Sequence, residues 1–340
     1  MIRLLALPVG WLVLGALLGA DDKHAEWKAR LADDGRRVAL EDSSNNDCLR
    51  CHQAIGQEWL HSTHATAWQD EHYQKALAKI RRKQGCWGCH APEPLAAAAW
   101  PQKPAARESD RHLGVTCVTC HLAADGETML GPAGHANAAH PSEAHEVFDS
   151  DASNALCIAC HATNIGPVIG VAKDFVSTDQ AELGSSCVEC HMGRTKRAWA
   201  EPWEDGQQAF PMRRGRSHRI KTPRDPDFLS DAFHLSAERT PKGARLTIEN
   251  QTGHRVPGVQ GRSIHFEAYL AEAAEDPASA GKSGAVERKF DYRSFLPVED
   301  AVSLELEGSG DILHVRGMHT PPGTTKAQLF LKRTIELESR

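Results

Sequence analysis

Cys48-Leu49-Arg50-Cys51-His52 is the first of five stretches in which two cysteines stand three positions apart and a histidine follows the second. The other four are Cys86-Trp87-Gly88-Cys89-His90, Cys117-Val118-Thr119-Cys120-His121, Cys157-Ile158-Ala159-Cys160-His161 and Cys187-Val188-Glu189-Cys190-His191. These pairs use all 10 cysteines of the 340-residue chain, so no cysteine is left over.

The Cys-x-x-Cys-His pattern is the attachment signature of c-type haem. Its two thiols add to the vinyl groups of the macrocycle as thioethers, and the histidine that follows binds the iron. The sequence therefore predicts five covalently bound haem c groups. The cysteines are the attachment points, and the proximal iron ligands are His52, His90, His121, His161 and His191.

Three other uses of paired cysteines fit the sequence less well. An exported protein often forms disulfides, zinc sites combine Cys-x-x-Cys pairs with histidines, and a single pair can be a redox dithiol. None of these requires a histidine directly after the second cysteine. Because the histidine is present five times out of five, the pattern favours haem.

Five macrocycles attached between Cys48 and His191 leave little room for an ordinary core of side chains. Large apolar groups at this density form much of the core themselves. We therefore expect an α plus irregular multihaem domain over residues 21–232, made of short helices and loops around closely stacked haems.

The N-terminus has the pattern of a secretory signal peptide. Arg3 gives it a positive start, an apolar run extends from Leu4 to Leu18, and Ala20 precedes the polar Asp21. This pattern favours cleavage near Ala20, whereas a membrane-spanning helix needs about 20 apolar residues. We expect an exported chain that does not span the membrane, in the periplasm or alternatively at the cell surface.

The charge excludes one class of partner. The chain has a formal net charge of −6, whereas proteins that bind nucleic acids present a basic face. We expect no nucleic acid partner and expect redox proteins instead, either cytochromes or membrane quinol-linked complexes. The oligomeric state stays open.

Nineteen histidines are many for a chain of this length, and the proximal positions use only five of them. Four others are candidates for the sixth ligand of an iron, on the side opposite the proximal histidine. They are His64 in Trp59-Leu60-His61-Ser62-Thr63-His64, His140 in Ala138-Ala139-His140-Pro141, His218 in Arg216-Ser217-His218-Arg219, and His254 in Asn250-Gln251-Thr252-Gly253-His254.

Several of these segments resemble the cytochrome c554-like multihaem family. The resemblance rests on the first motif with its downstream Trp59, Ser62 and His64, on Gly114 to His121, and on Cys187 to Met192. It covers roughly residues 45–275. It implies an electron-transfer cytochrome with bis-histidine haems, in which His64, His140, His218 and His254 are the sixth ligands.

The sixth ligand of the one remaining haem stays open. His112, just before the third motif, is our choice, and the alternatives are His24, His61, His72, His135 and His145. One haem could also lack a sixth ligand from the protein, which would give it an open position for catalysis.

Residues 233–340 contain no cysteine and change in pattern. Apolar and polar residues alternate over residues 246–248, 264–270, 302–306 and 327–331, which is the period of a β-strand. Turn-forming residues such as Pro257-Gly258 and Pro321-Pro322-Gly323 separate these runs. We expect a small antiparallel β-domain of five to seven strands, folded as a sandwich.

Three functions are compatible with these features. An electron carrier between redox partners agrees best with five haems and a surplus of histidines. The second is an oxidoreductase that acts on a small nitrogen or sulfur compound at an iron with an open coordination site. The third is a structural subunit of an extracellular haem assembly. We favour the first function, in which the protein is an electron carrier rather than a catalyst.

Overall fold

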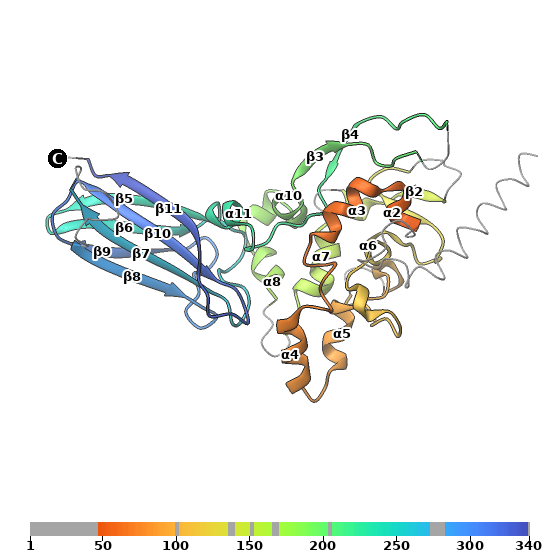
Figure 1. Cartoon of the computed structure of the whole chain (residues 1–340), viewed down its shortest axis with the longest axis horizontal. Coiled ribbons are helices and arrows are strands. Elements are labelled where there is room, and N and C mark those ends of the chain that lie inside the picture. Colours follow the sequence, from red (N-terminus) through yellow and green to blue (C-terminus); the bar gives the residue numbers. More distant parts are fainter. Residues whose placement is uncertain are drawn as a thin grey trace, which may run out of the picture. The chain divides into compact units, whose positions relative to one another are not determined.

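A computed structural model describes most of the chain after the first 46 residues. The described residues are 47–98, 102–134, 140–149, 153–164, 170–202, 206–272 and 283–338. Short helices and loops form the first part, and antiparallel strands form the second (Figure 1). The predicted signal peptide lies outside the described residues, as do His24 and His135.

The chain divides into two compact units. The first consists of residues 1–69, 87–156 and 195–218, and the second of residues 70–86, 157–194 and 219–340. The units are interleaved along the chain, whereas the sequence predicts one boundary at residues 232–233. The strand β5 does begin at Phe233.

Short elements make up the first unit. They are α2 (Asp47–Cys51), α3 (Gln53–Leu60), η2 (Leu95–Ala98), η3 (Arg111–Leu113), α6 (Cys117–His121), β1 (Met129–Gly131), β2 (Ser142–Ala144), η4 (Glu146–Phe148) and β4 (Arg213–Arg216). β1 pairs with β2 in parallel. The division between the units falls within α5 (Gln84–His90), α7 (Asn154–His161) and β3 (Arg194–Arg197), the strand that pairs with β4.

The second unit has both helices and strands. Its helices are α4 (Glu71–Lys79), α8 (Ala172–Phe175), α9 (Asp179–Glu182), α10 (Cys187–His191) and α11 (Pro226–Ser230). Its strands are β5 (Phe233–Thr240), β6 (Gly243–Asn250), β7 (Ser263–Ala271), β8 (Ser283–Phe290), β9 (Ala301–Glu307), β10 (Ile312–Thr320) and β11 (Gln328–Glu336).

The strands form two antiparallel sheets, with orders β5-β6-β9 and β11-β10-β7-β8. In β6, alternate residues such as Leu246 and Ile248 are fully buried. Ile264 and Phe266 repeat this pattern in β7. The alternation predicted from the sequence at these positions therefore marks real strands, each with one face toward a core.

Phenylalanine rings fill the centre of this core. The centroid of Phe266 lies 5.0 Å from that of Phe233, 5.9 Å from that of Phe330 and 6.3 Å from that of Phe290. Residues from both sheets belong to the same buried cluster. The β-rich part therefore has an ordinary side-chain core, unlike the segments that carry the cysteine motifs.

In the first unit, the largest buried cluster of the described residues is small and consists of Trp59, Ala65 and Leu113. Such a core is too small to support the fold by itself, since stability depends on the apolar area removed from water. This agrees with the expectation that a large apolar group completes the core. Among the described residues, no helix has the length and hydropathy that crossing a bilayer would require.

Candidate haem-binding site

Each Cys-x-x-Cys-His stretch forms about one turn of helix. The histidine is the last residue of α5, α6, α7 and α10, and in the first stretch His52 directly follows α2. Residues three positions apart lie on the same side of a helix, so the two thiols of a pair face one side and the imidazole stands at the helix end. None of the 10 cysteines, all in the described part of the chain, forms a disulfide.

Local hydrogen bonds start these short helices. At α10, the Ser186 hydroxyl accepts from the Glu189 backbone N–H, and the Glu189 carboxylate accepts from the Ser186 N–H, both at 3.3 Å. This reciprocal pair is a capping box. It fixes the first turn, and Cys187, Cys190 and His191 are arranged on that turn.

Backbone carbonyls orient four proximal imidazoles through Nδ1. The distances are 2.5 Å from His52 to Trp199 O, 2.6 Å from His90 to Ala67 O, 2.7 Å from His121 to Leu130 O and 2.7 Å from His191 to Lys221 O. A carbonyl only accepts a hydrogen bond, so Nδ1 carries the proton and Nε2 keeps its lone pair. Histidines that bind metals are commonly held in this way.

Three proximal imidazoles each face an imidazole from a distant part of the sequence. The ring centroids of His52 and His140 lie 6.4 Å apart, and those of His121 and His218 lie 6.1 Å apart. In the second unit, the rings of His191 and His254 are 6.4 Å apart with planes 17° from parallel. The structure thus brings together three of the four histidines singled out in the sequence with three proximal ones.

These separations fit one metal ion between each pair of rings. A histidine nitrogen binds a metal at about 2 Å, and the ring centre lies about 1 Å behind the nitrogen, so two imidazoles on opposite sides of one iron have centroids about 6 Å apart. The three observed distances agree with this value. Two imidazole rings in direct van der Waals contact could have centroids closer together than this.

Burial favours the neutral form of four of these imidazoles. It lowers the pKa of His121, His140 and His254. The pKa of His218 falls to about 3, first because of burial and then because of the nearby His121. Since only a neutral imidazole has a lone pair for a metal, these shifts favour iron ligation.

His254 sits in a loop that Asn250 holds in place. The Asn250 Nδ2 donates to the backbone carbonyls of His254 at 2.9 Å and Pro297 at 2.8 Å, while its Oδ1 accepts from the Thr252 N–H at 2.9 Å. Asn250 is buried. This asparagine lies in the segment that made His254 a candidate, but its own role is visible only in the structure.

An ion pair fastens the same loop to α8. The Arg255 Nε and Nη2 donate to the two carboxylate oxygens of Asp174 at 2.6 and 2.7 Å. Gly253 packs so closely on the Phe175 ring that a Cβ there would collide with it. Together with Asn250, these contacts fix where the His254 imidazole points.

Glu58 holds the backbone of His218. Its carboxylate accepts from the His218 N–H at 2.8 Å and lies 3.3 Å from Arg197 Nη1. All three residues belong to the first unit. The chain around His218, whose ring lies opposite that of His121, is therefore positioned by a partly buried ion pair.

His64 is partly buried beside the third motif. Its carbonyl accepts from the Val115 N–H at 3.0 Å. Gly114, with φ of +66°, lies so close that a Cβ there would be 2.5 Å from the same carbonyl oxygen. This packing places His64 next to the chain that leads into α6.

The candidates for the last ligand differ in their surroundings. His112 is exposed in η3, His61 is exposed with Nδ1 2.7 Å from Gln57 O, and His72 is exposed on α4. His145 accepts from the Val147 N–H at Nδ1, so its Nε2 carries the proton in the neutral form. Burial therefore does not distinguish His112 from His61 and His72.

The cysteines differ in their environments. Burial raises the pKa of the Cys120 thiol to about 12 and also raises that of Cys190. In the second unit, a hydrogen bond from the Cys157 thiol lowers the pKa of Cys187. The attachment cysteines of the fourth and fifth motifs therefore lie side by side.

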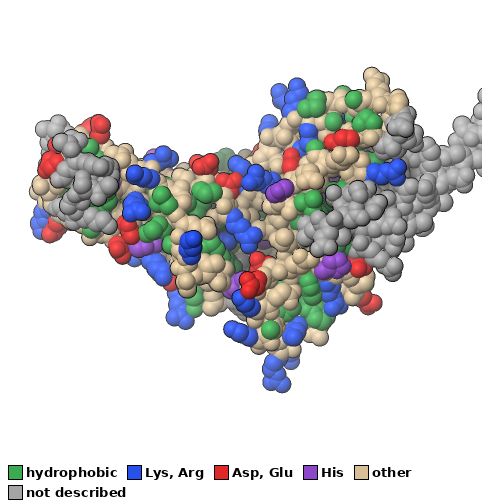
Figure 2. Space-filling model, viewed as in Figure 1, with side chains coloured by type: hydrophobic (Ala, Val, Ile, Leu, Met, Phe, Trp, Pro, Cys, Tyr) green, Lys and Arg blue, Asp and Glu red, His purple; other side chains and the backbone are tan. Residues whose placement is uncertain are grey.

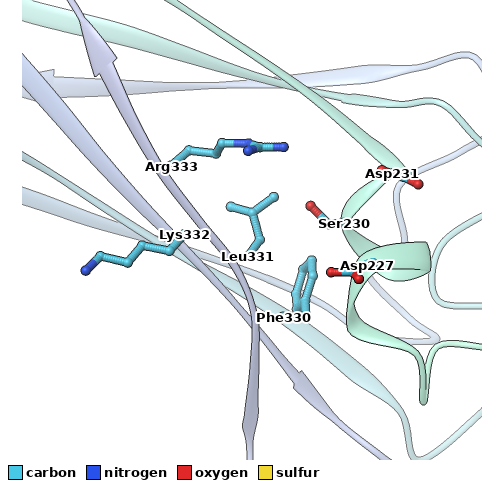
Figure 3. A pocket seen from close by; sticks show the side chains of 7 residues that line it. All are labelled: Asp227, Ser230, Asp231, Phe330, Leu331, Lys332 and Arg333. Carbon is cyan, nitrogen blue, oxygen red and sulfur yellow. The ribbon is translucent and has the colours of Figure 1, made fainter.

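A hollow of about 320 Å³ between α11 and β11 has a different lining (Figure 3). Its walls are Asp227, Ser230, Asp231, Phe330, Leu331, Lys332 and Arg333. Figure 3 shows Lys332 and Leu331 pointing to opposite sides of the strand, as expected for successive strand residues. The lining contains neither cysteine nor histidine, so this hollow is separate from the candidate site.

Residues 47–122 and 131–193 match a family described as cytochrome c554 and c-prime. These residues contain all five motifs. The fold is similar to that of a penta-haem cytochrome c552 from Thermochromatium tepidum, with a TM-score of 0.54, 16% sequence identity, and coverage of 89% of this chain and 100% of that chain. No curated protein matches the sequence.

Motifs, helix ends and oriented imidazoles define a multihaem c-type cytochrome, a protein that binds haem c and transfers electrons. Within this class, residues 47–122 and 131–193 are similar to the cytochrome c554 and c-prime family.

Proposed function

We propose that this protein is an exported electron carrier with five haem c groups, most of them bound by two histidines. The observation that carries the proposal is the set of three imidazole pairs, with centroids 6.1 to 6.4 Å apart. Bis-histidine ligation gives lower reduction potentials than histidine–methionine ligation. Export is supported by the N-terminal sequence alone.

The three pairs assign three ligand sets. His52 with His140 binds the first haem, His121 with His218 the third, and His191 with His254 the fifth. His64 is proposed as the sixth ligand of a further haem. The β-rich part, which we infer to be a small sandwich, supplies His254 and so completes the fifth site.

Neighbouring ligand sets support transfer from haem to haem within each unit. In the first unit, His52 lies close enough to His121 and His218 to influence the pKa of each. In the second, the Cys157 and Cys187 thiols are in contact. These residues hold the first haem near the third and the fourth near the fifth, which suits stepwise electron transfer.

Redox partners are proposed to dock through small, transient contacts, as such encounters usually do. Acidic and basic side chains are interspersed over the face of the protein shown in Figure 2. The net charge of −6 favours partners with a basic docking surface.

Electron paramagnetic resonance (EPR) of the oxidised protein, made in a host that matures c-type cytochromes, tests the proposal. We expect low-spin signals from the wild type, and one haem converted to high spin in each of His140→Ala, His218→Ala and His254→Ala. His234→Ala, at an exposed position of β5, is the matched control and should leave the spectrum unchanged. Spectra of the three variants that equal the wild type would refute the ligand assignment.

A further inference from the structure

Arg262 is a partly buried cation without an anionic partner. It lies along the chain between the loop of His254 and β7, and its Nε is inaccessible to solvent and makes no hydrogen bond. Among the described residues, no carboxylate forms an ion pair with it. Because an unpaired charge removed from water is strongly unfavourable, this arginine is expected to meet an anion that the polypeptide does not provide.

His319 lies on the same face of the sheet as Arg262. His319 of β10 is opposite Ile264 of β7, and Ile264 is two residues beyond Arg262, so the three side chains share one side of the sheet. His319 is only 2% exposed, and its Nε2 has no hydrogen-bond partner. The charge of Arg262 also reaches this ring, because it adds to burial in lowering the pKa of His319 to about 4.

The surroundings of the two residues are basic. Arg224 is close enough for its charge to add to burial in lowering the pKa of Arg262 to about 10. The nearby Asp70 is already used, since its carboxylate accepts from Arg224 Nη2 at 3.2 Å and from the Tyr73 N–H at 2.9 Å. We call Arg224, Arg262 and His319 the basic cluster.

Arg262, one member of the basic cluster, lies near His254. Arg262 and His254 belong to the same connection between β6 and β7. Burial is the largest cause of the lowered pKa of His254, and smaller influences come from the Arg255 backbone, His191 and Asp174. The positive charge of Arg262 lowers this pKa further. All of these residues belong to the second unit, so their proximity is internal to one compact body.

We propose that Arg262, with His319 beside it, binds a propionate carboxylate of the haem held by Cys187, Cys190, His191 and His254. This inference rests on the proposed function, because it requires that haem. A carboxylate supplies the missing anion, and the guanidinium can bind it in bidentate geometry. The positive charge then favours the reduced, less positively charged state of that haem and raises its potential.

Redox titration of the holoprotein, followed by visible absorption and EPR, tests the inference. We expect Arg262→Gln to lower one of the potentials by about 59 mV, which is a tenfold change in the equilibrium constant of a one-electron couple. Arg262→Lys, which keeps the charge, should lower it less. Arg316→Gln, which removes a half-exposed arginine on the same strand as His319, should change none of the potentials.

Two further experiments identify the haem that Arg262 affects and the anion that it binds. His254→Met should move the potential of the fifth haem upward, and Arg262→Gln combined with it should lower that displaced potential. Resonance Raman spectra should show a shifted propionate bending mode in Arg262→Gln. A free anion would behave differently: added inorganic phosphate would shift the wild-type potential while the propionate mode stayed constant, and this result would overturn the inference.

Failure of this inference is distinguishable from failure of the proposed function. The intact mass of each sample gives the number of haems, and a wild type without haem at Cys187 and Cys190 contradicts the proposed function. Intact haems with all five potentials unchanged in both Arg262→Gln and Arg262→Lys contradict only the propionate contact.

Discussion

The imidazole rings of His191 and His254 face each other with centroids 6.4 Å apart and planes 17° from parallel. One ring ends a helix of the cysteine motifs, and the other comes from the connection between β6 and β7 in the β-rich part. The gap between them matches the space that one iron ion needs between two histidine nitrogens. In the proposed ligand assignment, the β-rich part therefore contributes a ligand to the fifth haem.

Replacing His254 with methionine tests this relationship through the reduction potential. His254→Met should raise the potential of one haem and leave four unchanged, because methionine ligation favours the reduced iron. Redox titration measures the change. His234→Met, at an exposed position of β5, is the control, and an equal shift in both variants would contradict the assignment.

Asn250 should be the most sensitive polar residue of the His254 loop. Asn250→Ala removes donors to the His254 and Pro297 carbonyls and leaves buried groups unsatisfied, which costs about 1–3 kcal/mol for each such group. Urea denaturation of the holoprotein measures the loss of stability, and EPR should show a mixture of coordination states at one haem. Gln251→Ala, next to it but exposed, should change stability by less than about 0.5 kcal/mol.

Sequence patterns predicted the elements that repeat and missed those that depend on the path of the chain. The cysteine motifs and the alternation at Leu246, Ile248 and Ile264 are local, so they could be recognised without a structure. The pairing of His52 with His140 joins segments far apart in sequence, and nothing local encodes it. The carbonyls of Trp199 and Lys221 carry no signal at all, because any residue provides a carbonyl.

The sixth ligands show the same limit. Position near a motif favoured His112, yet this side chain is exposed. Asn250 stands in the segment that made His254 a candidate, but its role could be recognised only from its burial and its hydrogen bonds.

The Asp174–Arg255 ion pair should make stability depend on pH. Burial raises the pKa of Asp174, but the hydrogen bonds and charge of Arg255 outweigh it and hold this pKa below the usual value of an aspartate. A lowered pKa in the folded state stabilises the fold above the unfolded-state pKa, and this stability is lost as the pH falls through the lower, folded-state value.

The comparison of wild type with Asp174→Asn measures this contribution. The wild type should be more stable by about 1.5–3 kcal/mol at neutral pH, the range for hydrogen bonds to charged groups. The difference should shrink as the pH falls below about 4. Denaturant titrations between neutral and acidic pH give the curve, and a difference that grows on acidification would be inconsistent with a lowered pKa of Asp174.

Gly114 should tolerate a side chain worse than Gly126 does. Both have positive φ, +66° and +75°, so alanine is strained at either position. At Gly114 a Cβ would also lie 2.5 Å from the His64 carbonyl oxygen, whereas at Gly126 it would meet nothing within 4 Å. Gly126→Ala should cost about 1 kcal/mol.

Gly114→Ala should cost more, by about 1–3 kcal/mol, because the contact between His64 and the third motif must open. Thermal unfolding of both variants, followed through haem absorption, measures the difference. Equal losses of stability would show that the close packing against His64 contributes nothing.

Anomalous diffraction at the iron absorption edge, from crystals of the holoprotein, locates every iron and so decides the ligand assignment. We predict five iron peaks, of which three lie midway between the Nε2 atoms of His52 and His140, of His121 and His218, and of His191 and His254. Iron found away from these midpoints, or histidine pairs that meet with no metal between them, would contradict the assignment.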